Sequence, residues 1–224
     1  MKTPHARGDI VHAIVPVNIL RASKERLAPN LNPSNRSRLS AAMLTDVLQT
    51  LRKVRRIQSI TVVSADKSVQ RIAQPRGVHF LWEGRRRGLN KGLRLAIRDS
   101  LRRKASATLI LPSDIPLVTP HEIRRLLNAS EGYSVALTPS KDGGTNALFL
   151  RPPGVIAPAF GKNSFRRHLS IAHRNGLSVK VVRLSGIRAD VDEPTDLTRI
   201  TRLPLRNETG RFLRSLRGAR ETKV

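Results

Sequence analysis

The stretch LILPSDIPL, residues 109–117, carries a single carboxylate at the end of an apolar run. Asp114 stands between Pro112 and Pro116, two residues whose backbone is restricted. A charged carboxylate beside apolar residues costs free energy unless a partner satisfies it. The segment permits two interpretations: a turn residue that caps the following segment, or an acid fixed at the end of a strand, where it binds a metal ion or a substrate.

A second acidic segment, ADVDEPTDL, spans residues 189–197 and follows a predicted strand. Asp190 and Asp192 are two residues apart, and in extended backbone such side chains point the same way. Carboxylates that face one spot suit a hard divalent cation such as magnesium, which commonly shares its site with substrate phosphates. Asp192 followed by Glu193 and Pro194 is also typical of a helix cap, which accounts for Asp192 but leaves Asp190 unexplained.

A basic loop, NILRASKERL at residues 18–27, follows the first predicted strand and contains Arg21, Lys24 and Arg26. Cations at this place suit the phosphates of a nucleotide, although the loop lacks the glycines with which a Walker loop cradles phosphate. Taken alone, the loop is better interpreted as a solvated basic surface.

Two glycine-containing segments, KDGGTNALFL at 141–150 and FGKNSFRRHL at 160–169, complete the set. The pair of glycines in the first permits a tight turn or the close approach of a ligand to the backbone, although most such pairs are only turns. In the second, Asn163 or Ser164 is expected to cap the next helix, whose free amides favour an anion. The six histidines show no metal-ligand spacing, and we assign them no role: they are His5, His12, His79, His121, His168 and His173.

Apolar patterning predicts strands that alternate with helices. Nearly continuous apolar runs indicate strands buried on both faces, and the segment from Thr119 to Glu122 has the residues of a capping box. The predicted strands are 10–17, 59–64, 78–82, 107–112, 133–139, 145–150 and 178–184, and the predicted helices are 34–51, 89–103, one that starts at 120, and 163–175.

This order predicts a single α/β domain with a mostly parallel, Rossmann-like sheet flanked by helices, and with ligands at the carboxyl ends of the strands. A chain of 224 residues is long enough for one such core. We expect an N-terminal extension at 1–9, the folded domain at 10–200 and a partly ordered basic tail at 201–224.

The formal net charge is +26, from 42 Lys and Arg residues against 16 Asp and Glu. Such a charge attracts polyanions and anionic small molecules alike. Aromatic residues make up only 3% of the chain, too few for the stacking platforms of single-strand binders, so we expect no nucleic-acid binding beyond non-specific attraction. The absence of cysteine excludes disulfides and thiolate metal sites. No apolar run approaches the ~20 residues that cross a membrane, and no signal-peptide pattern is present, so we expect a cytoplasmic protein.

Taken in order, a set of segments resembles the guanylyltransferases of coenzyme F-420 biosynthesis, which are relatives of the molybdenum-cofactor guanylyltransferases and the sugar-nucleotide pyrophosphorylases. Each segment alone is a weak signal, whereas their common order over residues 10–200 is specific. The resemblance implies a single-domain nucleotidyltransferase fold. The segments are IVPVN followed by ASKERLAP, then GLNKGL, LPSDIPL, GGTNALFLRPP, AFGKNSFRRHL and DVDEPTDL.

In that family the enzyme joins GTP to 2-phospho-L-lactate, phosphoenolpyruvate or 3-phospho-D-glycerate and releases pyrophosphate. The activated unit then passes to the transferase that uses the deazaflavin Fo. Chemical reasoning agrees, because nucleotidyl transfer needs in-line placement and the cancellation of phosphate charge more than it needs a protein nucleophile.

The resemblance also implies a role for each matched residue. Three acids would hold Mg²⁺, a basic pair would face the GTP phosphates and assist catalysis, one amide would read the guanine, and three further residues would bind the phosphorylated acid. In that order, these residues are Asp114, Asp190 and Asp192; Lys24 and Arg26; Asn90; and Thr145, Gly161 and Ser164. One position departs from the family: Asn18 stands where Lys is frequent, and Arg21 is a candidate to replace the lost charge.

Two other functions stay open at this point. The same fold can transfer another nucleotide to a sugar phosphate or another cofactor precursor, and a non-catalytic basic protein can bind nucleic acid. The chain has no glycine between Asp9 and Gly77, which argues against the molybdenum-cofactor enzymes with their glycine-rich first loop. The converging acids argue against a protein that only binds polyanions. The sequence decides neither which three-carbon acid is used nor whether the protein forms a homodimer.

Overall fold

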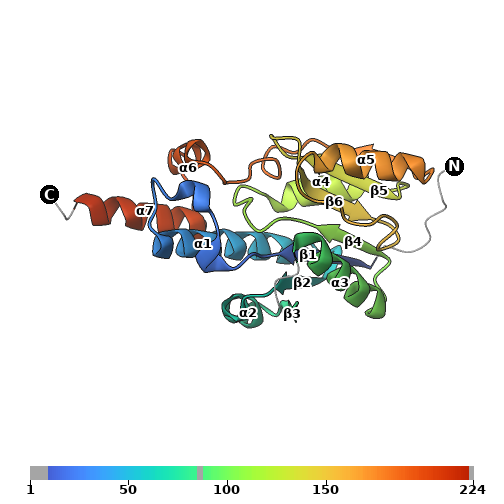
Figure 1. The fold of residues 1–224 in the computed structure, drawn as a ribbon, viewed down its shortest axis with the longest axis horizontal. Coiled ribbons are helices and arrows are strands. Elements are labelled where there is room, and N and C mark those ends of the chain that lie inside the picture. Colours follow the sequence, from blue (N-terminus) through green and yellow to red (C-terminus); the bar gives the residue numbers. More distant parts are fainter. Residues whose placement is uncertain (1–9, 85–87, 222–224) are drawn as a thin grey trace.

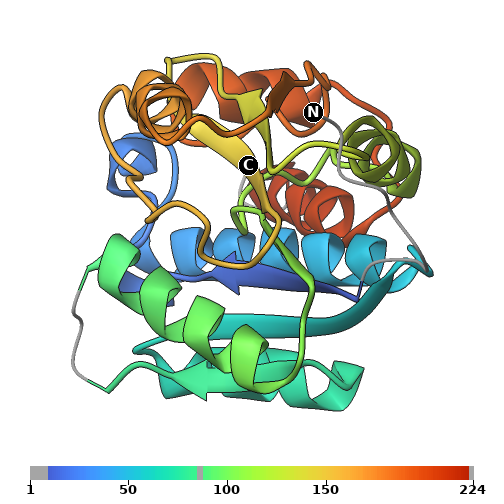
Figure 2. The ribbon, with the colours of Figure 1, turned by 90° about the vertical axis from the view of Figure 1, so that its right-hand side faces the viewer.

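The computed structural model describes residues 10–84 and 88–221. These residues form one seven-stranded sheet with helices on both faces (Figures 1 and 2), which confirms the predicted α/β class. The strands are β1 Val11–Pro16, β2 Ile57–Ser64, β3 His79–Trp82, β4 Ala107–Ile110, β5 Val135–Pro139, β6 Thr145–Leu150 and β7 Val179–Val181. The α-helices are α1 Pro33–Arg52, α2 Lys67–Ala73, α3 Leu89–Arg102, α4 Pro120–Ala129, α5 Ser164–Arg174, α6 Pro194–Thr201 and α7 Glu208–Glu221.

The strand order is β3-β2-β1-β4-β6-β5-β7. All neighbours are parallel except β6, which runs antiparallel to both β4 and β5. Because β6 is reversed, its first residue, Thr145, pairs with Pro139 at the carboxyl end of β5. The amino end of β6 therefore lies at the same edge of the sheet as the carboxyl ends of β1 and β4, where ligands bind in such folds.

Each face of the sheet is covered by an apolar layer. Helices α1, α2 and α4 supply one layer, and α3 and α5 supply the other. Fully buried side chains such as Leu48 of α1 and Leu93 of α3 stabilise the fold by ~1.5–3 kcal/mol each. A third cluster lies between α1, α6 and α7 and consists of Leu27, Leu31, Leu39, Met43, Val191, Leu197, Ile200, Phe212 and Leu213.

Local sequence signals set the helix starts. The predicted capping box of α4 is confirmed: the Glu122 backbone N–H donates to the Thr119 hydroxyl at 3.2 Å, and the Glu122 carboxylate accepts from the Thr119 N–H at 3.2 Å. In α1, Pro33 occupies the first turn and Asn32 caps it, accepting from the Asn35 N–H at 2.8 Å. Within the described residues, none of the helices is long and apolar enough to cross a membrane.

The structure differs from the sequence-based expectations at four places. Helix α2 was not predicted, and it is short and capped by Asp66. Helix α6 was not among the predicted helices either, although the cap noted in the sequence at 192–194 lies at its start. Strand β7 ends at Val181 rather than at residue 184, and a turn at 185–188 follows it. Residues 208–221, within the expected tail, form helix α7, which lies along α1 in Figure 1 and buries Phe212 and Leu213.

Asp46 of α1 holds the amino end of α7. Its carboxylate accepts from the backbone N–H groups of Glu208 at 2.8 Å and Thr209 at 2.9 Å, and from the Thr209 hydroxyl at 2.6 Å. Burial raises the pKa of Asp46, although these hydrogen bonds oppose the rise. A carboxylate on a helix start stabilises it through both hydrogen bonds and the helix dipole, so a residue of α1 caps a helix more than 160 positions later in the chain.

We predict that Asp46→Ala loosens α7 because its first turn loses three acceptors. The free energy of unfolding should fall by ~0.5–2 kcal/mol, measured by urea denaturation, and the Glu208 and Thr209 amides should exchange their hydrogens faster. Gln49→Ala, on the exposed side of the same helix, is the control and should change neither quantity. Unaltered exchange at Thr209 in the Asp46 variant would contradict the capping role.

Candidate active site

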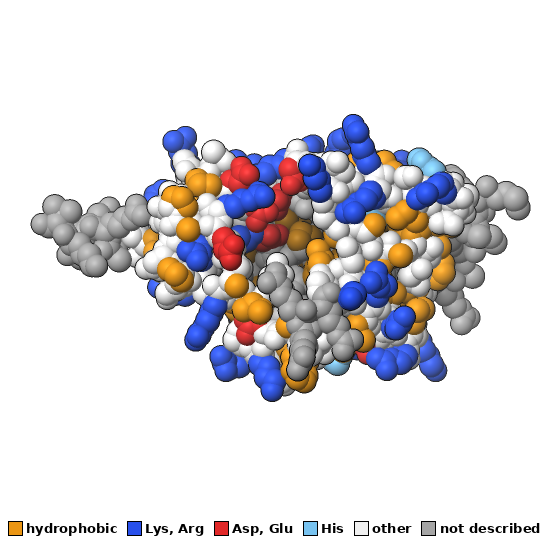
Figure 3. Space-filling model, viewed as in Figure 1, with side chains coloured by type: hydrophobic (Ala, Val, Ile, Leu, Met, Phe, Trp, Pro, Cys, Tyr) orange, Lys and Arg blue, Asp and Glu red, His pale blue; other side chains and the backbone are white. Residues whose placement is uncertain are grey.

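The carboxyl edge of the sheet is hollowed by a cavity of about 620 Å³. On the face shown in Figure 3, acidic side chains gather around this hollow, whereas Lys and Arg side chains are spread over much of the surface. Polar and apolar side chains share its wall. The lining residues include Asn18, Ser23, Lys24, Arg26, Ser40, Pro112, Ser113, Asp114, Asp142 and Asp192.

Lys24 lies between two of the predicted acids. Its Nζ donates to Asp114 Oδ2 and to Asp192 Oδ1, each at 2.5 Å, and its side chain is only 7% exposed. Burial alone would lower the pKa of Lys24, but the carboxylates of Asp114 and Asp192 outweigh it and raise that pKa. The ammonium group therefore stays charged and offsets part of the negative charge of the two carboxylates. Its backbone is left-handed, with φ 56°, as the chain turns into the short helix Glu25–Leu27.

Asp190 is the third predicted acid, and it is almost fully buried. Its Oδ1 accepts from Asn146 Nδ2 at 3.0 Å, and the same amide group donates to the carbonyl of Ile187 at 3.0 Å. Burial raises the pKa of Asp190 to about 6; the Asn146 hydrogen bond opposes the rise, and the charges of Asp114 and Asp192 add to it. The repulsion shows that the three acids share one electrostatic environment.

Backbone contacts join the two acidic segments. The N–H of Val191, between Asp190 and Asp192, donates to the carbonyl of Asp114 at 3.0 Å. The alternative interpretation of Asp192 as a helix cap is wrong, because the cap of α6 is Glu193. The Asp196 carboxylate accepts from the N–H groups of both Asp192 and Glu193. The Asp192 carboxylate therefore does not cap α6, and it accepts from Lys24 instead.

The donor set is chemically suited to a hard cation. Carboxylate oxygens are the ligands that magnesium and manganese prefer, and a positive group, the Lys24 ammonium, already sits between two of them. In the part of the chain that the structure describes, no group of three or more acids or histidines is arranged to hold a metal ion. The magnesium role of Asp114, Asp190 and Asp192 thus stays a prediction.

The residues predicted to bind the phosphorylated acid are brought together by β6 and α5. Thr145 and Ser164 are buried, and their hydroxyl oxygens are 3.3 Å apart. Thr145 Oγ1 is also 3.0 Å from Nδ1 of His168. Gly161 has φ +118°, which favours glycine, and its carbonyl accepts from the Ser164 N–H at 3.0 Å. Asn163 starts α5 in a left-handed conformation without a side-chain cap.

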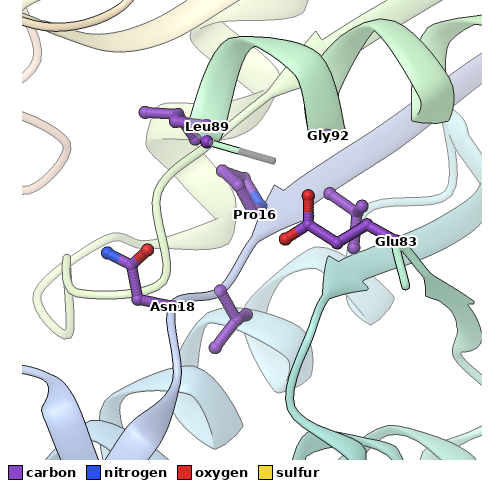
Figure 4. Close-up of a pocket in the computed structure, with 8 residues that line it drawn as sticks. Pro16, Asn18, Glu83, Leu89 and Gly92 are labelled. Atoms are coloured by element: carbon purple, nitrogen blue, oxygen red, sulfur yellow. The ribbon is translucent and has the colours of Figure 1, made fainter. Parts of the chain in front are cut away.

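A smaller cavity of about 240 Å³ lies beside the first, at the ends of β1 and β3 (Figure 4). Asn18 and Glu83 bring polar groups to its wall, and Pro16 and Leu89 bring apolar surface. Gly92 leaves room for the Glu83 side chain, because a Cβ there would lie 2.6 Å from its carboxylate oxygen.

Three residues singled out in the sequence, Asn90, Arg21 and Arg26, do not line this smaller cavity. Asn90 pairs with the backbone of Phe160, donating from Nδ2 to its carbonyl at 3.0 Å and accepting from its N–H at 2.8 Å. Its reading of a guanine therefore stays a prediction. Arg21 is exposed and is not among the residues that line either cavity, while Arg26, 73% exposed, pairs with Glu193 at 3.4 Å.

The sequence of the chain matches the family model described as guanylyl transferase CofC like, over residues 11–223. The chain belongs to this family. It is 42% identical over 187 residues to a phosphoenolpyruvate guanylyltransferase of Sphaerobacter thermophilus, a match that covers 83% of this chain and 89% of the relative. It is 32% identical over 209 residues to a 2-phospho-L-lactate guanylyltransferase of Methanobrevibacter smithii, covering 93% and 92%.

Solved structures show the same fold at low sequence identity. A protein from Desulfovibrio desulfuricans described as a nucleotide-diphospho-sugar transferase aligns with a TM-score of 0.75 at 18% identity, covering 92% of this chain and 94% of that one. The Mycobacterium tuberculosis protein Rv0371c, in a complex with manganese, aligns with a TM-score of 0.59 at 18% identity, covering 87% and 98%. The family, the nucleotidyltransferase fold and the assignment as a guanylyltransferase enzyme are thus confirmed.

Sequence reasoning missed three residues near the candidate site. Asn146 anchors Asp190, His168 contacts Thr145, and Glu83 reaches the smaller cavity. A signal was present for the first two, because Asn146 stands inside the GGTN segment and His168 inside the AFGKNSFRRHL segment, both of which carried the resemblance. No signal was present for Glu83, because a single Glu without spacing to partners is uninformative.

The raised pKa of Asp190 predicts a pH-dependent stability difference. Since its pKa rises from the ordinary 3.8 to about 6, the folded protein binds this proton more tightly than the unfolded chain, and stability falls as pH increases across that window. Asp190→Asn keeps the acceptor for Asn146 and removes the charge. In metal-free buffer at about pH 8 the variant should be more stable than wild type by up to ~3 kcal/mol, a gain that vanishes below about pH 4.

Thermal denaturation across this pH range checks the prediction. Asp142→Asn is the control of opposite sign, because the Ser140 hydroxyl bond lowers the pKa of Asp142, and neutralising it should cost stability at about pH 8. If Asp190→Asn is less stable than wild type at about pH 8, the carboxylate charge of Asp190 stabilises the folded protein and the prediction is wrong.

Proposed function

We propose that the protein transfers the guanylyl group of GTP to a three-carbon phosphorylated acid and releases pyrophosphate, in the synthesis of coenzyme F-420. The observation that carries the proposal is the pairing of Lys24 with Asp114 and Asp192 at the carboxyl edge of the sheet, in a chain that belongs to the guanylyl transferase family. Phosphoenolpyruvate is the acid to test first, since the relatives at 42% and 40% identity carry that substrate in their names.

The two cavities divide the nucleotide between them. The smaller one is proposed to take the guanine between apolar walls at Pro16 and Leu89. Glu83, which lines it, is proposed to accept from the N1 and N2 hydrogens that distinguish guanine from adenine. The larger one leads from Asn18 to Lys24 and Arg26, the cations proposed to face the phosphates and to assist catalysis. With Asn18 uncharged and Arg21 outside the cavity, these two residues supply the basic side chains that the loop brings to its wall.

Asp114, Asp190 and Asp192 are proposed to hold a divalent cation, and Mg²⁺ is the natural choice for a carboxylate set that shares its ion with phosphates. A similar solved structure is a complex with manganese. When bound, the ion would offset negative charge on the phosphates of the nucleotide. Lys24, held by the same carboxylates, is then available to pair with phosphate oxygens as well.

The acceptor needs no protein nucleophile. An oxygen of the acid's own phosphate attacks the α-phosphorus of GTP, the bond to the bridging oxygen of the β-phosphate breaks, and pyrophosphate leaves with that electron pair. Thr145, Gly161 and Ser164 are proposed to hold the acid for this attack. The protein supplies placement and positive charge, which are the main requirements of phosphoryl chemistry.

The product is a reactive diphosphate-linked unit, and its use requires hand-over to the transferase that joins it to Fo. We propose that this exchange takes place in the cytoplasm.

Pyrophosphate release from GTP, measured with phosphoenolpyruvate, 3-phospho-D-glycerate, 2-phospho-L-lactate and a sugar phosphate in parallel, tests the function. One of the three acids should support turnover. Asp114→Asn and Asp192→Asn should each reduce it by at least ~100-fold, the cost of losing a key electrostatic stabiliser. Glu131→Gln, an exposed acid paired with Arg56, is the matched control and should be fully active. Turnover with the sugar phosphate alone would overturn the assignment of the acceptor.

The substrate site yields a separate prediction. Thr145→Val and Ser164→Ala should raise the KM for the acid about 10-fold or more, because a site built to hydrogen-bond an anion loses that energy when a donor is removed. The KM for GTP should change little. Steady-state kinetics with each substrate varied separately measure both. If the variants weaken GTP and spare the acid, the two halves of the site are assigned the wrong way round.

A further inference from the structure

His168 of α5 lies against the proposed acid-binding residues and is fully buried. Both ring nitrogens have partners: Nε2 is 2.9 Å from the backbone nitrogen of Ala159, and Nδ1 is 3.0 Å from Thr145 Oγ1. The ring also packs edge-on against Phe160, with centroids 5.0 Å apart at 71°. With both nitrogens bonded and one edge packed, the ring has one defined orientation.

The Ala159 contact fixes where the ring proton resides. A backbone N–H can only donate, so Nε2 must accept and carries no hydrogen. In the neutral ring the single proton is then on Nδ1, which donates to Thr145 Oγ1. Burial, and then the charge of Arg167, lower the pKa of His168 to about 4, so the ring is neutral near neutral pH.

The direction of this hydrogen bond decides what the hydroxyl groups can do. Thr145 and Ser164 share one further hydrogen bond of 3.3 Å. The chain of His168, Thr145 and Ser164 thus contains two hydrogen bonds and three protons, one from Nδ1 and one from each hydroxyl, so one hydroxyl proton is left for a ligand. With the opposite tautomer, Thr145 would donate to the ring, both hydroxyl protons would be consumed, and no donor would remain.

We infer that His168 is a positioning residue, which donates from Nδ1 to Thr145 and so keeps one hydroxyl proton of the Thr145–Ser164 pair available to an oxygen of a bound anion. The identity of that anion, the phosphorylated three-carbon acid, rests on the proposed function. The direction of the hydrogen bonds rests only on the contact with Ala159. The role suits the place of the pair, at the edge of the sheet where Thr145 begins β6 and Ser164 begins α5.

Two substitutions separate the two hydrogen bonds of the ring. His168→Asn places an amide near the position of Nδ1 and retains a donor for Thr145, whereas His168→Gln reaches the position of Nε2 and retains only the acceptor for Ala159. The KM for phosphoenolpyruvate, or for whichever acid proves active, should rise about 10-fold or more in the Gln variant and much less in the Asn variant. The KM for GTP should change little in both. His173→Gln, exposed on the same helix, is the matched control.

The opposite order, with the Asn variant the weaker, would overturn the inference, because a residue that only holds the backbone at Ala159 needs its Nε2 acceptor. Equal effects of the two variants would overturn it as well. Nitrogen-15 NMR of the wild-type imidazole gives a test that needs neither variant nor substrate: a proton on Nδ1 supports the inference, and a proton on Nε2 refutes it. If no acid turns over, the proposed function fails while the NMR result still decides the position of the proton.

Discussion

The ion triplet of Lys24 with Asp114 and Asp192 is the interaction on which the arrangement of the site depends. Two carboxylates on separate segments repel each other, and only a shared cation lets them stay close. The cost of the left-handed backbone at Lys24, ~1–3 kcal/mol for a non-glycine residue, is offset by this double pairing. Removing the ammonium group would leave two acids facing each other beside the buried Asp190, and the 18–27 loop would lose its anchor to the sheet edge.

The acidic and basic side chains are distributed differently over the molecule. The formal charge of +26 spreads over much of the surface, whereas several acids are concentrated around one hollow (Figure 3). The long-range field therefore attracts anions of any kind, and in the proposed function the local carboxylates would hold a cation among the phosphates. The surface as a whole is positive and the wall of the hollow is rich in acids. The first acts on an anion at long range, and the second acts only once the anion has entered the hollow.

Patterns within short segments were sufficient for the fold class and for part of the site. Apolar patterning located each of the seven strands and helices α1, α3, α4 and α5, and both hydrogen bonds of the predicted Thr119 capping box are present. The rule that ligands meet the carboxyl ends of parallel strands placed Asp114 at the right edge. The sequence could not predict contacts between residues that are far apart in the chain. Lys24 pairs with Asp114 across 90 residues and with Asp192 across 168. The capping of α7 by Asp46 and the orientation of His168 are of the same kind, and neither leaves a local pattern.

The third apolar cluster connects helix α7 to the two charged segments of the candidate site, the 18–27 loop and the 189–197 segment. Leu27 directly follows Arg26, Val191 stands between Asp190 and Asp192, and both pack in the cluster that contains Phe212 and Leu213 of α7. The basic loop and the acidic segment therefore pack against the same apolar cluster. Because the cluster is closely packed, the volume of one of its side chains cannot change without a change in another. In evolutionary terms, helix α7 is coupled to these two segments: a larger side chain at one position of the cluster needs a smaller one opposite it, so Phe212 and Leu213 cannot change independently of their neighbours.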